Sequence, residues 1–355
     1  MPYSDRKRIN FNKINNTRIE YFEKIIRPNV LLEKLPASPG IRDLVLRTRG
    51  SISNILKGKD KRMLFIVGPC SIHDTDEAKV YGKHLKILAD KVKDKILIVM
   101  RVYFEKPRTT IGWKGLINDP DLNGTFDVNK GLSMARELLL YLNGIGLPCG
   151  YEILDTITPQ YICDLISWGA IGARTTESQT HRQVVSGLSM PVGFKNGTSG
   201  CIEIAANAIL SATFPQCFMG ITGGGEPAIC KTKGNQDCHI ILRGGRDAPN
   251  YEWNSILETE NILKAKDIPQ NIMIDCSHGN SRKNHRNQLL VLKTIVSHVR
   301  NGSKSLMGVM LESNINEGKQ KLEEPGKLKY GVSITDACIS IEDTEKLLLY
   351  THSCL

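Results

Sequence analysis

Two apolar runs decide the fold, LFIVG at residues 64–68 and ILIVMRV at residues 96–102. Runs that are apolar at every position are typical of strands buried on both faces, as in a parallel sheet. Similar short runs recur along the rest of the chain. They are LPCGYEIL (147–154), AIGA (170–173), PVGFK (191–195), HIILR (239–243), NIMIDC (271–276) and LMGVMLE (306–312).

Amphipathic patterns lie between these runs and predict helices. The predicted helices span residues 75–92, 130–144, 159–167, 179–188, 199–212, 253–266, 284–300 and 338–350. Buried strands that alternate with helices eight times are what a (β/α)8 barrel requires. The sequence therefore predicts the α/β class and a (β/α)8 TIM barrel. A doubly wound open sheet is the alternative, but no G-x-G-x-x-G follows the first run, so its dinucleotide-binding form has no support.

Two segments do not fit the strand–helix rhythm. Residues 1–60 are polar and interrupted by prolines, and they predict an N-terminal helical extension that precedes a catalytic barrel over residues 61–355. Residues 217–233, CFMGITGGGEPAICKTK, contain two strand-like stretches around a glycine-rich turn. That pattern predicts an inserted β-hairpin before the sixth barrel strand.

Composition excludes several classes of protein. The net charge is +10, but the lysines are spread along the chain and only 6% of residues are aromatic, so nucleic-acid binding is disfavoured. No apolar run approaches the ~18 residues of a membrane helix, and the polar N-terminus is not a secretory signal. Ten cysteines without a C-x-x-C pair predict reduced, mostly buried thiols and a cytoplasmic protein.

Cationic residues gather just past the predicted strand ends, where the active sites of such barrels lie. They are Arg101, Lys106, Arg108, Arg174, Lys195 and Arg243. Six unpaired cations at one mouth would repel one another, so the pattern indicates multiply anionic ligands. Guanidinium groups suit phosphate and carboxylate, and the sequence therefore predicts at least one phosphorylated substrate. A lone arginine at a strand end is more often a surface ion pair.

A second group of strand-end residues offers metal ligands: Cys70, His278, Glu312 and Asp336. A thiolate, an imidazole and two carboxylates suit a divalent ion such as Mn, Fe, Co or Zn. The four residues come from different strands, so no local spacing rule identifies them. Cys70 with His73 resembles half of a zinc site, but no second half completes it.

Long motifs at these positions resemble the bacterial type I 3-deoxy-D-arabino-heptulosonate 7-phosphate (DAHP) synthases. The resemblance covers essentially the whole chain and is weakest in the first 40 residues. The matching stretches are GPCSIHD (68–74), MRVYFEKPRTTIGWKGLINDPDLNG (100–124), WGAIGARTTESQTHR (168–182), PVGFKNGT (191–198), HIILRGG (239–245), DCSHGNS (275–281), ESNINEG (312–318) and YGVSITDACIS (330–340).

The resemblance implies a metal-dependent transferase that condenses phosphoenolpyruvate with D-erythrose 4-phosphate at the start of the shikimate pathway to the aromatic amino acids. It implies one divalent ion on the four ligands named above. The implied phosphoenolpyruvate residues are Arg101, Arg174, Lys195 and Arg243, and the implied erythrose 4-phosphate residues are Lys106, Pro107, Arg108 and Thr109. In the expected mechanism Lys106 protonates the developing alkoxide, and the alternative proton donors are His278 and a metal-bound water. Glu152 either orients the attacking water or balances the cations.

The resemblance also implies feedback inhibition by an aromatic amino acid, with tyrosine favoured, and a homodimer or homotetramer. Segments such as SGLSMP (186–191) are most like the tyrosine-sensitive isoform. The implied effector pocket comprises Pro159, Gln160, Val184, Leu188, Ser189 and Phe218. Two other functions stay open: a sister enzyme that uses arabinose 5-phosphate, against which the K-P-R-T-T loop argues, and a non-catalytic polyanion-binding protein.

Overall fold

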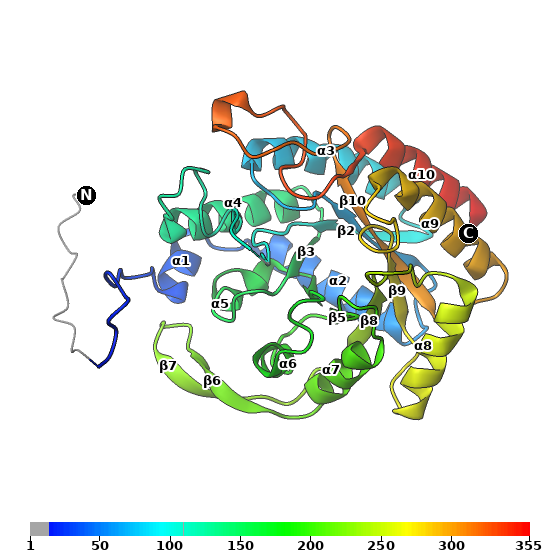
Figure 1. Cartoon of the computed structure of the whole chain (residues 1–355), viewed down its shortest axis with the longest axis horizontal. Helices are drawn as coiled ribbons and strands as arrows, with labels where there is room; N and C mark the ends of the chain where they lie inside the picture. Colours follow the sequence, from blue (N-terminus) through cyan, green and yellow to red (C-terminus); the bar gives the residue numbers. More distant parts are fainter. Residues whose placement is uncertain (1–13, 109) are drawn as a thin grey trace.

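The computed structural model describes residues 14–108 and 110–355 (Figure 1). Its parallel strands lie in the order β1-β2-β3-β4-β5-β8-β9-β10, and β1 also pairs with β10, so the sheet closes on itself. The predicted (β/α)8 barrel is therefore confirmed. The barrel strands are β1 (Met63–Gly68), β2 (Ile96–Arg101), β3 (Cys149–Glu152), β4 (Trp168–Ile171), β5 (Val192–Lys195), β8 (Cys238–Leu242), β9 (Ile272–Asp275) and β10 (Leu306–Asn314).

Helices surround the barrel. They are α3 (Thr75–Val92), α4 (Val128–Gly144), α5 (Pro159–Ile162), α6 (Gln179–Val185), α7 (Glu203–Thr213), α8 (Trp253–Ala265), α9 (Gln288–Arg300) and α10 (Ile341–Cys354). Short 3-10 turns occur at Cys163–Leu165, His285–Asn287 and Pro325–Lys327. No helix among the described residues is both long and apolar enough to span a bilayer.

One predicted helix, over residues 159–167, is wrong in length. The structure has a single turn, α5, followed by a 3-10 turn. Arginine side chains bind the carbonyl groups there: Arg49 donates to Cys163 O at 2.6 Å and to Ile166 O at 2.7 Å, and Arg136 donates to Tyr161 O at 2.9 Å. These side-chain bonds replace the i→i+4 bonds of a longer helix.

The N-terminal segment closes one end of the barrel. Of its described part, residues 14–27 contain no helix or strand, and α1 (Pro28–Lys34) and α2 (Pro39–Leu56) follow. Ile52 and Ile55 of α2 belong to the same apolar cluster as Leu64 and Trp168, which line the barrel interior. Figure 1 shows α2 crossing the barrel at this end, which we call the lower end. Burial of these side chains makes α2 part of the barrel core.

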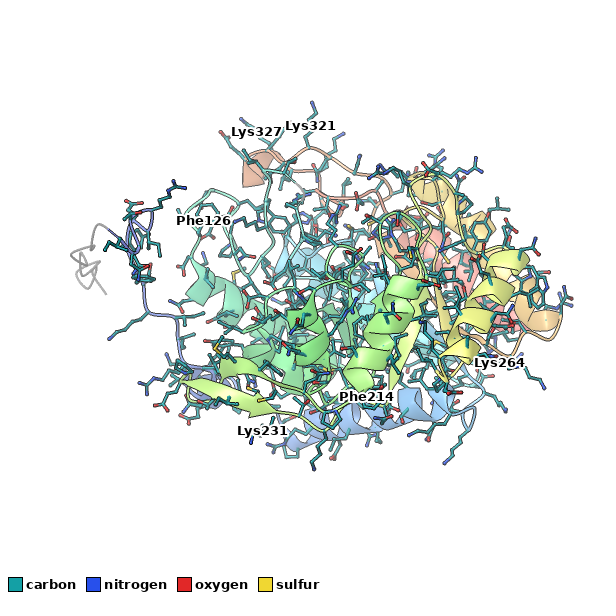
Figure 2. The ribbon with its side chains drawn as sticks, turned by 60° about the horizontal axis from the view of Figure 1, so that its bottom comes forward. Phe126, Phe214, Lys231, Lys264, Lys321 and Lys327 are labelled. Atoms are coloured by element: carbon teal, nitrogen blue, oxygen red, sulfur yellow. The ribbon has the colours of Figure 1, made fainter. Side chains whose placement is uncertain are left out.

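The inserted hairpin is confirmed within the predicted range. β6 (Cys217–Ile221) and β7 (Pro227–Lys231) pair antiparallel outside the barrel. The backbone N–H of Asn29, in α1, donates to Gly223 O of the hairpin turn at 2.8 Å, so the turn rests on the N-terminal segment. Figure 2 shows Lys231 and Phe214 at the outer edge of this region.

Candidate active site

The upper end of the barrel interior is charged. Side chains on a strand alternate between its two faces, so the interior positions recur every second residue. Above the apolar Val99, Ala170, Ile241, Met273 and Met310, the last interior positions carry ionisable groups. They are Arg101, Glu152, Lys195, Arg243, Asp275 and Glu312. A cavity of about 350 Å³ opens over this layer and is lined by several of these side chains.

Three of the four predicted metal ligands converge. One ligand atom from each of Cys70, Glu312 and Asp336 lies within 4.8 Å of the other two. His278 lies beside them, because its Nε2 is 3.8 Å from Oε1 of Glu312. Burial raises the pKa of the Cys70 thiol, and the charge of Glu312 raises it further. A buried thiol beside two carboxylates is a site that a cation would complete, because the cation would favour the thiolate.

The loop that carries Asp336 is fixed next to the barrel strand β10. β11 (Ile339–Ser340) pairs with β10 beyond the barrel, at Ser313 and Asn314. Ser71 and Thr335 share a hydrogen bond of 2.8 Å between their hydroxyl groups. These contacts bring Asp336 over Cys70, with 3.8 Å between Oδ2 and Sγ.

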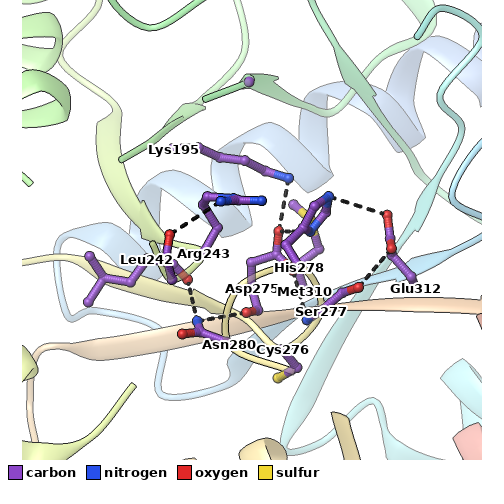
Figure 3. Close-up of polar contacts among 12 residues, drawn as sticks. Lys195, Leu242, Arg243, Asp275, Cys276, Ser277, His278, Asn280, Met310 and Glu312 are labelled. Atoms are coloured by element: carbon purple, nitrogen blue, oxygen red, sulfur yellow. Dashed lines mark hydrogen bonds and ion pairs between the residues drawn. The ribbon is translucent and has the colours of Figure 1, made fainter. Parts of the chain in front are cut away.

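Asp275 organises the other side of the site (Figure 3). Its Oδ2 accepts from Nζ of Lys195 at 2.9 Å and lies 2.9 Å from Nδ1 of His278. Burial alone would raise the pKa of Asp275, but His278 and Lys195 hold it well below its ordinary value. The backbone of His278 is left-handed, with φ of 54°, a conformation that non-glycine residues rarely adopt. The imidazole is thereby directed from the loop toward Glu312.

Arg101 is held on several sides. It donates to Pro69 O at 3.0 Å, to Cys70 O at 3.1 Å and to Oε1 of Glu312 at 2.9 Å. The guanidinium carbon lies 3.6 Å from the centre of the Tyr103 ring, a cation–π contact. Burial would raise the pKa of Glu312, but His278, Arg101 and Lys106 lower it to about 2. Glu312 is therefore a carboxylate at any physiological pH.

The K-P-R loop spans two depths. Lys106 is 9% exposed and its Nζ lies 3.1 Å from Sγ of Cys70, whereas Arg108 is exposed at the rim of the cavity. Arg108 donates from Nε to Trp113 O at 2.8 Å. Thr109, the remaining residue predicted for the erythrose 4-phosphate site, lies outside the described residues.

The sequence interpretation missed several residues of the cavity and its floor: Tyr103, Asp275, Ser277, Lys283 and Lys319. Asp275 ends a buried strand, so the rule that found Lys195 could have found it as well. Lys283 and Lys319 come from loops, and no periodic signal marks them.

The six residues predicted for an effector pocket lie on three segments. Pro159 and Gln160 are on α5, which packs against α1 and α4. Val184 is on α6, Leu188 and Ser189 follow that helix, and Phe218 is on β6. α6 contacts β6, and a hydrogen bond of 2.7 Å between the Ser186 and Thr232 hydroxyl groups links this helix to the hairpin. The structure thus brings the α6 and β6 residues into neighbouring elements.

Comparison with known families identifies the group to which this site belongs. Residues 36–349 match the family described as the DAHP synthetase I family. The chain belongs to this family. Within the DAHP synthetase I family, the Phe-sensitive phospho-2-dehydro-3-deoxyheptonate aldolase of Escherichia coli (strain K12) is 52% identical over 334 residues, which cover 94% of this chain and 95% of that protein.

The Tyr-sensitive enzyme of the same strain is 50% identical over 340 residues, covering 96% of this chain and 95% of that protein. The solved structure of a phospho-2-dehydro-3-deoxyheptonate aldolase from Francisella tularensis SCHU S4 matches with a TM-score of 0.93 and 48% identity, over 95% of this chain and 98% of that one. Members of the DAHP synthetase I family with either sensitivity are similarly close. The tyrosine-sensitive isoform is therefore not singled out and stays a prediction.

Proposed function

We propose that the chain condenses phosphoenolpyruvate with D-erythrose 4-phosphate and water, and releases DAHP and inorganic phosphate. It is a phospho-2-dehydro-3-deoxyheptonate aldolase, as its relatives at about 50% identity are named. One observation carries the proposal: cationic side chains from the ends of several strands, including the buried Lys106 and Lys195, line a single cavity beside a cluster of potential metal ligands. Multiply anionic substrates would neutralise the cations, and an aldehyde oxygen could reach the ligand cluster.

The ligand cluster fits one divalent ion of the Mn, Fe, Co or Zn class. Cys70, His278, Glu312 and Asp336 would hold it, because their soft and hard donors together match ions of borderline character. Bound there, such an ion supplies Lewis-acid polarisation of a carbonyl oxygen. Asp275 supports the set by holding His278 through Nδ1, which leaves Nε2 to face the cluster.

The phosphoenolpyruvate site is assigned to Arg101, Lys195 and Arg243 of the upper layer and to Arg174, an exposed residue that also lines the cavity. Arg101 and Lys195 would bind the carboxylate, and Arg174, Lys195 and Arg243 the phosphate, because guanidinium and ammonium groups favour both anions. Lys195 is 3% exposed and engages Asp275 with one N–H, so other donors of its ammonium group can face a ligand. C3 of phosphoenolpyruvate then attacks the aldehyde carbon, water adds at C2, and the phosphate group leaves.

The second substrate is assigned to the K-P-R-T loop, residues 106–109. Arg108 at the rim would bind the phosphate of erythrose 4-phosphate, and Lys106 would donate a proton to the alkoxide formed from the aldehyde. The position of Lys106 beside Cys70 supports this role, with His278 as the alternative donor. Glu152, 5% exposed and at the end of β3, would orient the attacking water or balance the cations.

A matched pair of cysteine variants tests the metal assignment. Cys70 and Cys276 are both fully buried near the cavity, but only Cys70 belongs to the ligand cluster. Cys70→Ser should lose bound metal and activity far more readily than Cys276→Ser, as measured by elemental analysis and initial rates. Chelation should abolish wild-type activity and Mn should restore it. Equal metal loss in both variants, or full activity in metal-free protein, would show the assignment to be wrong.

The acceptor sugar and the effector need their own measurements. Initial rates with erythrose 4-phosphate and with arabinose 5-phosphate test the first assignment, and only the four-carbon sugar should be consumed. The names of the relatives, Phe-sensitive and Tyr-sensitive, support an aromatic amino-acid effector. We assign its pocket to the region of α5, α6 and β6, and propose a homodimer or homotetramer. Rates with added tyrosine, phenylalanine or tryptophan test the effector, and we expect tyrosine to inhibit most strongly.

A further inference from the structure

Three buried asparagines lie at the upper end of the barrel, just outside the ring of charged residues. Asn196 follows β5, Asn280 lies in the loop after β9, and Asn250 lies between β8 and α8. Their exposed fractions are 0%, 3% and 7%. A buried amide must satisfy two donor hydrogens and an oxygen acceptor, so its partners define what it holds together.

Asn196 joins the end of β5 to the end of β8. Its Oδ1 accepts from the backbone N–H of Arg243 at 2.8 Å. Its Nδ2 donates to Gly197 O at 2.9 Å and to Gly244 O at 3.1 Å. Because Asn196 directly follows Lys195, these bonds fix the backbone of Lys195 relative to that of Arg243.

Asn280 joins β8 to β9, as Figure 3 shows. Its Nδ2 donates to Leu242 O at 3.0 Å and to Asp275 O at 2.9 Å. The first carbonyl directly precedes Arg243, and the second belongs to Asp275 itself, at the end of β9. The Arg243 carbonyl accepts in turn from the backbone N–H groups of Gly279 at 3.0 Å and of Asn280 at 3.3 Å. Both backbone polar groups of Arg243 are thus bound.

Asn250 links the other two asparagines. Its Nδ2 donates to Oδ1 of Asn196 at 3.2 Å, its backbone N–H donates to Oδ1 of Asn280 at 2.8 Å, and its Oδ1 accepts from the Gly244 N–H at 2.6 Å. The turns it joins are pressed together, since a Cβ on Gly279 would lie 2.6 Å from Gly245 O. The two loops therefore cannot approach each other more closely, and the hydrogen bonds of Asn250 oppose their separation.

We propose that Asn196, Asn250 and Asn280, here called the asparagine brace, are positioning residues that set the spacing of Lys195, Arg243 and the Asp275–His278 pair for phosphoenolpyruvate. The inference rests on the proposed function, because it assigns a role toward that substrate. None of the three amides needs to touch the substrate. They act through the backbone of the residues that do.

Geometry explains why the brace should affect binding of one substrate. Cations that hold one anion must keep their spacing, and a misplacement of about 1 Å can cost roughly 10²-fold in rate. Erythrose 4-phosphate is assigned to the loop after β2, which the brace does not contact through any of the hydrogen bonds above. Loosening the brace should therefore raise KM for phosphoenolpyruvate and leave KM for erythrose 4-phosphate nearly unchanged.

Asn250→Asp tests the proposal, because it keeps the shape of the side chain and replaces the Nδ2 donor to Asn196 with a carboxyl oxygen. Asn143→Asp is the matched control. Asn143 is 3% exposed on α4, away from the cavity, and its Nδ2 donates to Leu139 O at 2.9 Å and to Leu165 O at 3.0 Å. Both variants bury a new carboxyl group, so a general loss of stability would affect them alike. Asn250→Ser removes the amide without adding a charge. It serves if the aspartate variant does not fold, and it must also weaken phosphoenolpyruvate binding if the loss comes from the brace and not from the new carboxyl group.

Steady-state kinetics and calorimetric binding of phosphoenolpyruvate to the metal-loaded protein give the readout. We expect KM and Kd for phosphoenolpyruvate to rise at least about tenfold in the Asn250 variant, with KM for erythrose 4-phosphate changed less than about twofold. Asn143→Asp should leave all three near wild type. Unchanged affinity in a folded Asn250 variant, or an equal change in both variants, would overturn the brace. A wild-type protein that turns over neither substrate would instead overturn the proposed function.

Discussion

The two ends of the barrel interior use the same strands for opposite purposes. At the lower end Leu64, Ile66 and Trp168 meet Ile52 and Ile55 of α2 in an apolar cluster. Val99, Met273 and Met310 belong to the same cluster, and two residues beyond each of them the interior carries Arg101, Asp275 and Glu312. These buried charges lie in ion pairs, Arg101 with Glu312 and Asp275 with Lys195. Apolar burial stabilises the fold, whereas buried ion pairs at best offset the cost of their own desolvation.

The difference indicates where each kind of substitution should act. Changes at the lower end should alter the free energy of unfolding and leave the kinetic constants alone. Changes at the upper end should alter both, because each charged group is balanced by neighbours that are also assigned to substrate or metal. The predictions below test this division, from the largest expected effect to the smallest.

Removing one charge from the upper end should have the largest effect. Glu312→Gln keeps the size of the side chain but leaves Arg101 without its carboxylate, at a cost of about 3–5 kcal/mol in the free energy of unfolding. Activity should be lost as well, since Glu312 belongs to the ligand cluster. Denaturant titration and initial rates measure both quantities. Glu317→Gln, at an exposed ion pair with Arg286, is the control and should change neither; a stable, active Glu312→Gln protein would contradict the assignment.

Cutting back the lower cluster should have the next largest effect, on stability alone. Ile52→Ala deletes a fully buried side chain and should cost about 2–4 kcal/mol. Leu46→Ala on the same helix is the control, because Leu46 is 63% exposed and should change stability by less than about 0.5 kcal/mol. Denaturant titration measures both variants. A large change in KM or kcat of folded Ile52→Ala would show that the two ends are not independent.

Glu105 should give the smallest effect and a pH-dependent one. It is an upper-end carboxyl that bonds the Tyr151 hydroxyl and faces Asp155 and Glu152, and burial raises its pKa from 4.5 to about 7. The folded state therefore holds this proton more tightly than the unfolded chain does. Its contribution to stability is full below pH 4.5 and is lost as the pH rises through about 7.

Comparison of wild type with Glu105→Gln isolates this contribution. Between pH 5 and 7 wild type should lose about 1–2 kcal/mol more than the variant. Thermal unfolding across that range provides the measurement. Parallel stability curves for the two proteins would mean that Glu105 titrates with its ordinary pKa. That result would place it among the well-solvated carboxyls.

Most of the barrel could be predicted from the sequence, because a strand buried on both faces leaves a local signal. LFIVG and ILIVMRV became β1 and β2, and the turn GGGEP marked the hairpin. Charged residues at strand ends were found in the same way, and the structure places Arg101 and Lys195 in one layer. The grouping of Cys70, His278, Glu312 and Asp336 as one ligand set came from the resemblance of the sequence motifs to a known family, because no local spacing rule joins them.

The features that could not be predicted from the sequence depend on contacts between segments that are far apart along the chain. Arg49 binds the carbonyl of Cys163, 114 positions away, and so shortens the helix predicted at 159–167. No local pattern in either segment predicts this contact. The asparagine brace cannot be predicted from the sequence either, because asparagine is a common residue in turns whether or not it has such partners. The role of Asp275 also depends on distant segments, because its carboxylate bonds Lys195 from another strand.

The helix that seals the lower end has a consequence for the order of events during turnover. Among the described residues, α2 fills the lower end, so a ligand reaches the buried cations from the upper end. It passes Arg108, which is exposed at the rim of the cavity, before it reaches Arg101 and Lys195, which are 1% and 3% exposed. On the proposed assignment, erythrose 4-phosphate bound at the rim blocks the exit of phosphoenolpyruvate bound below it. A group bound at the buried cations should therefore enter before a group bound at the rim and leave after it.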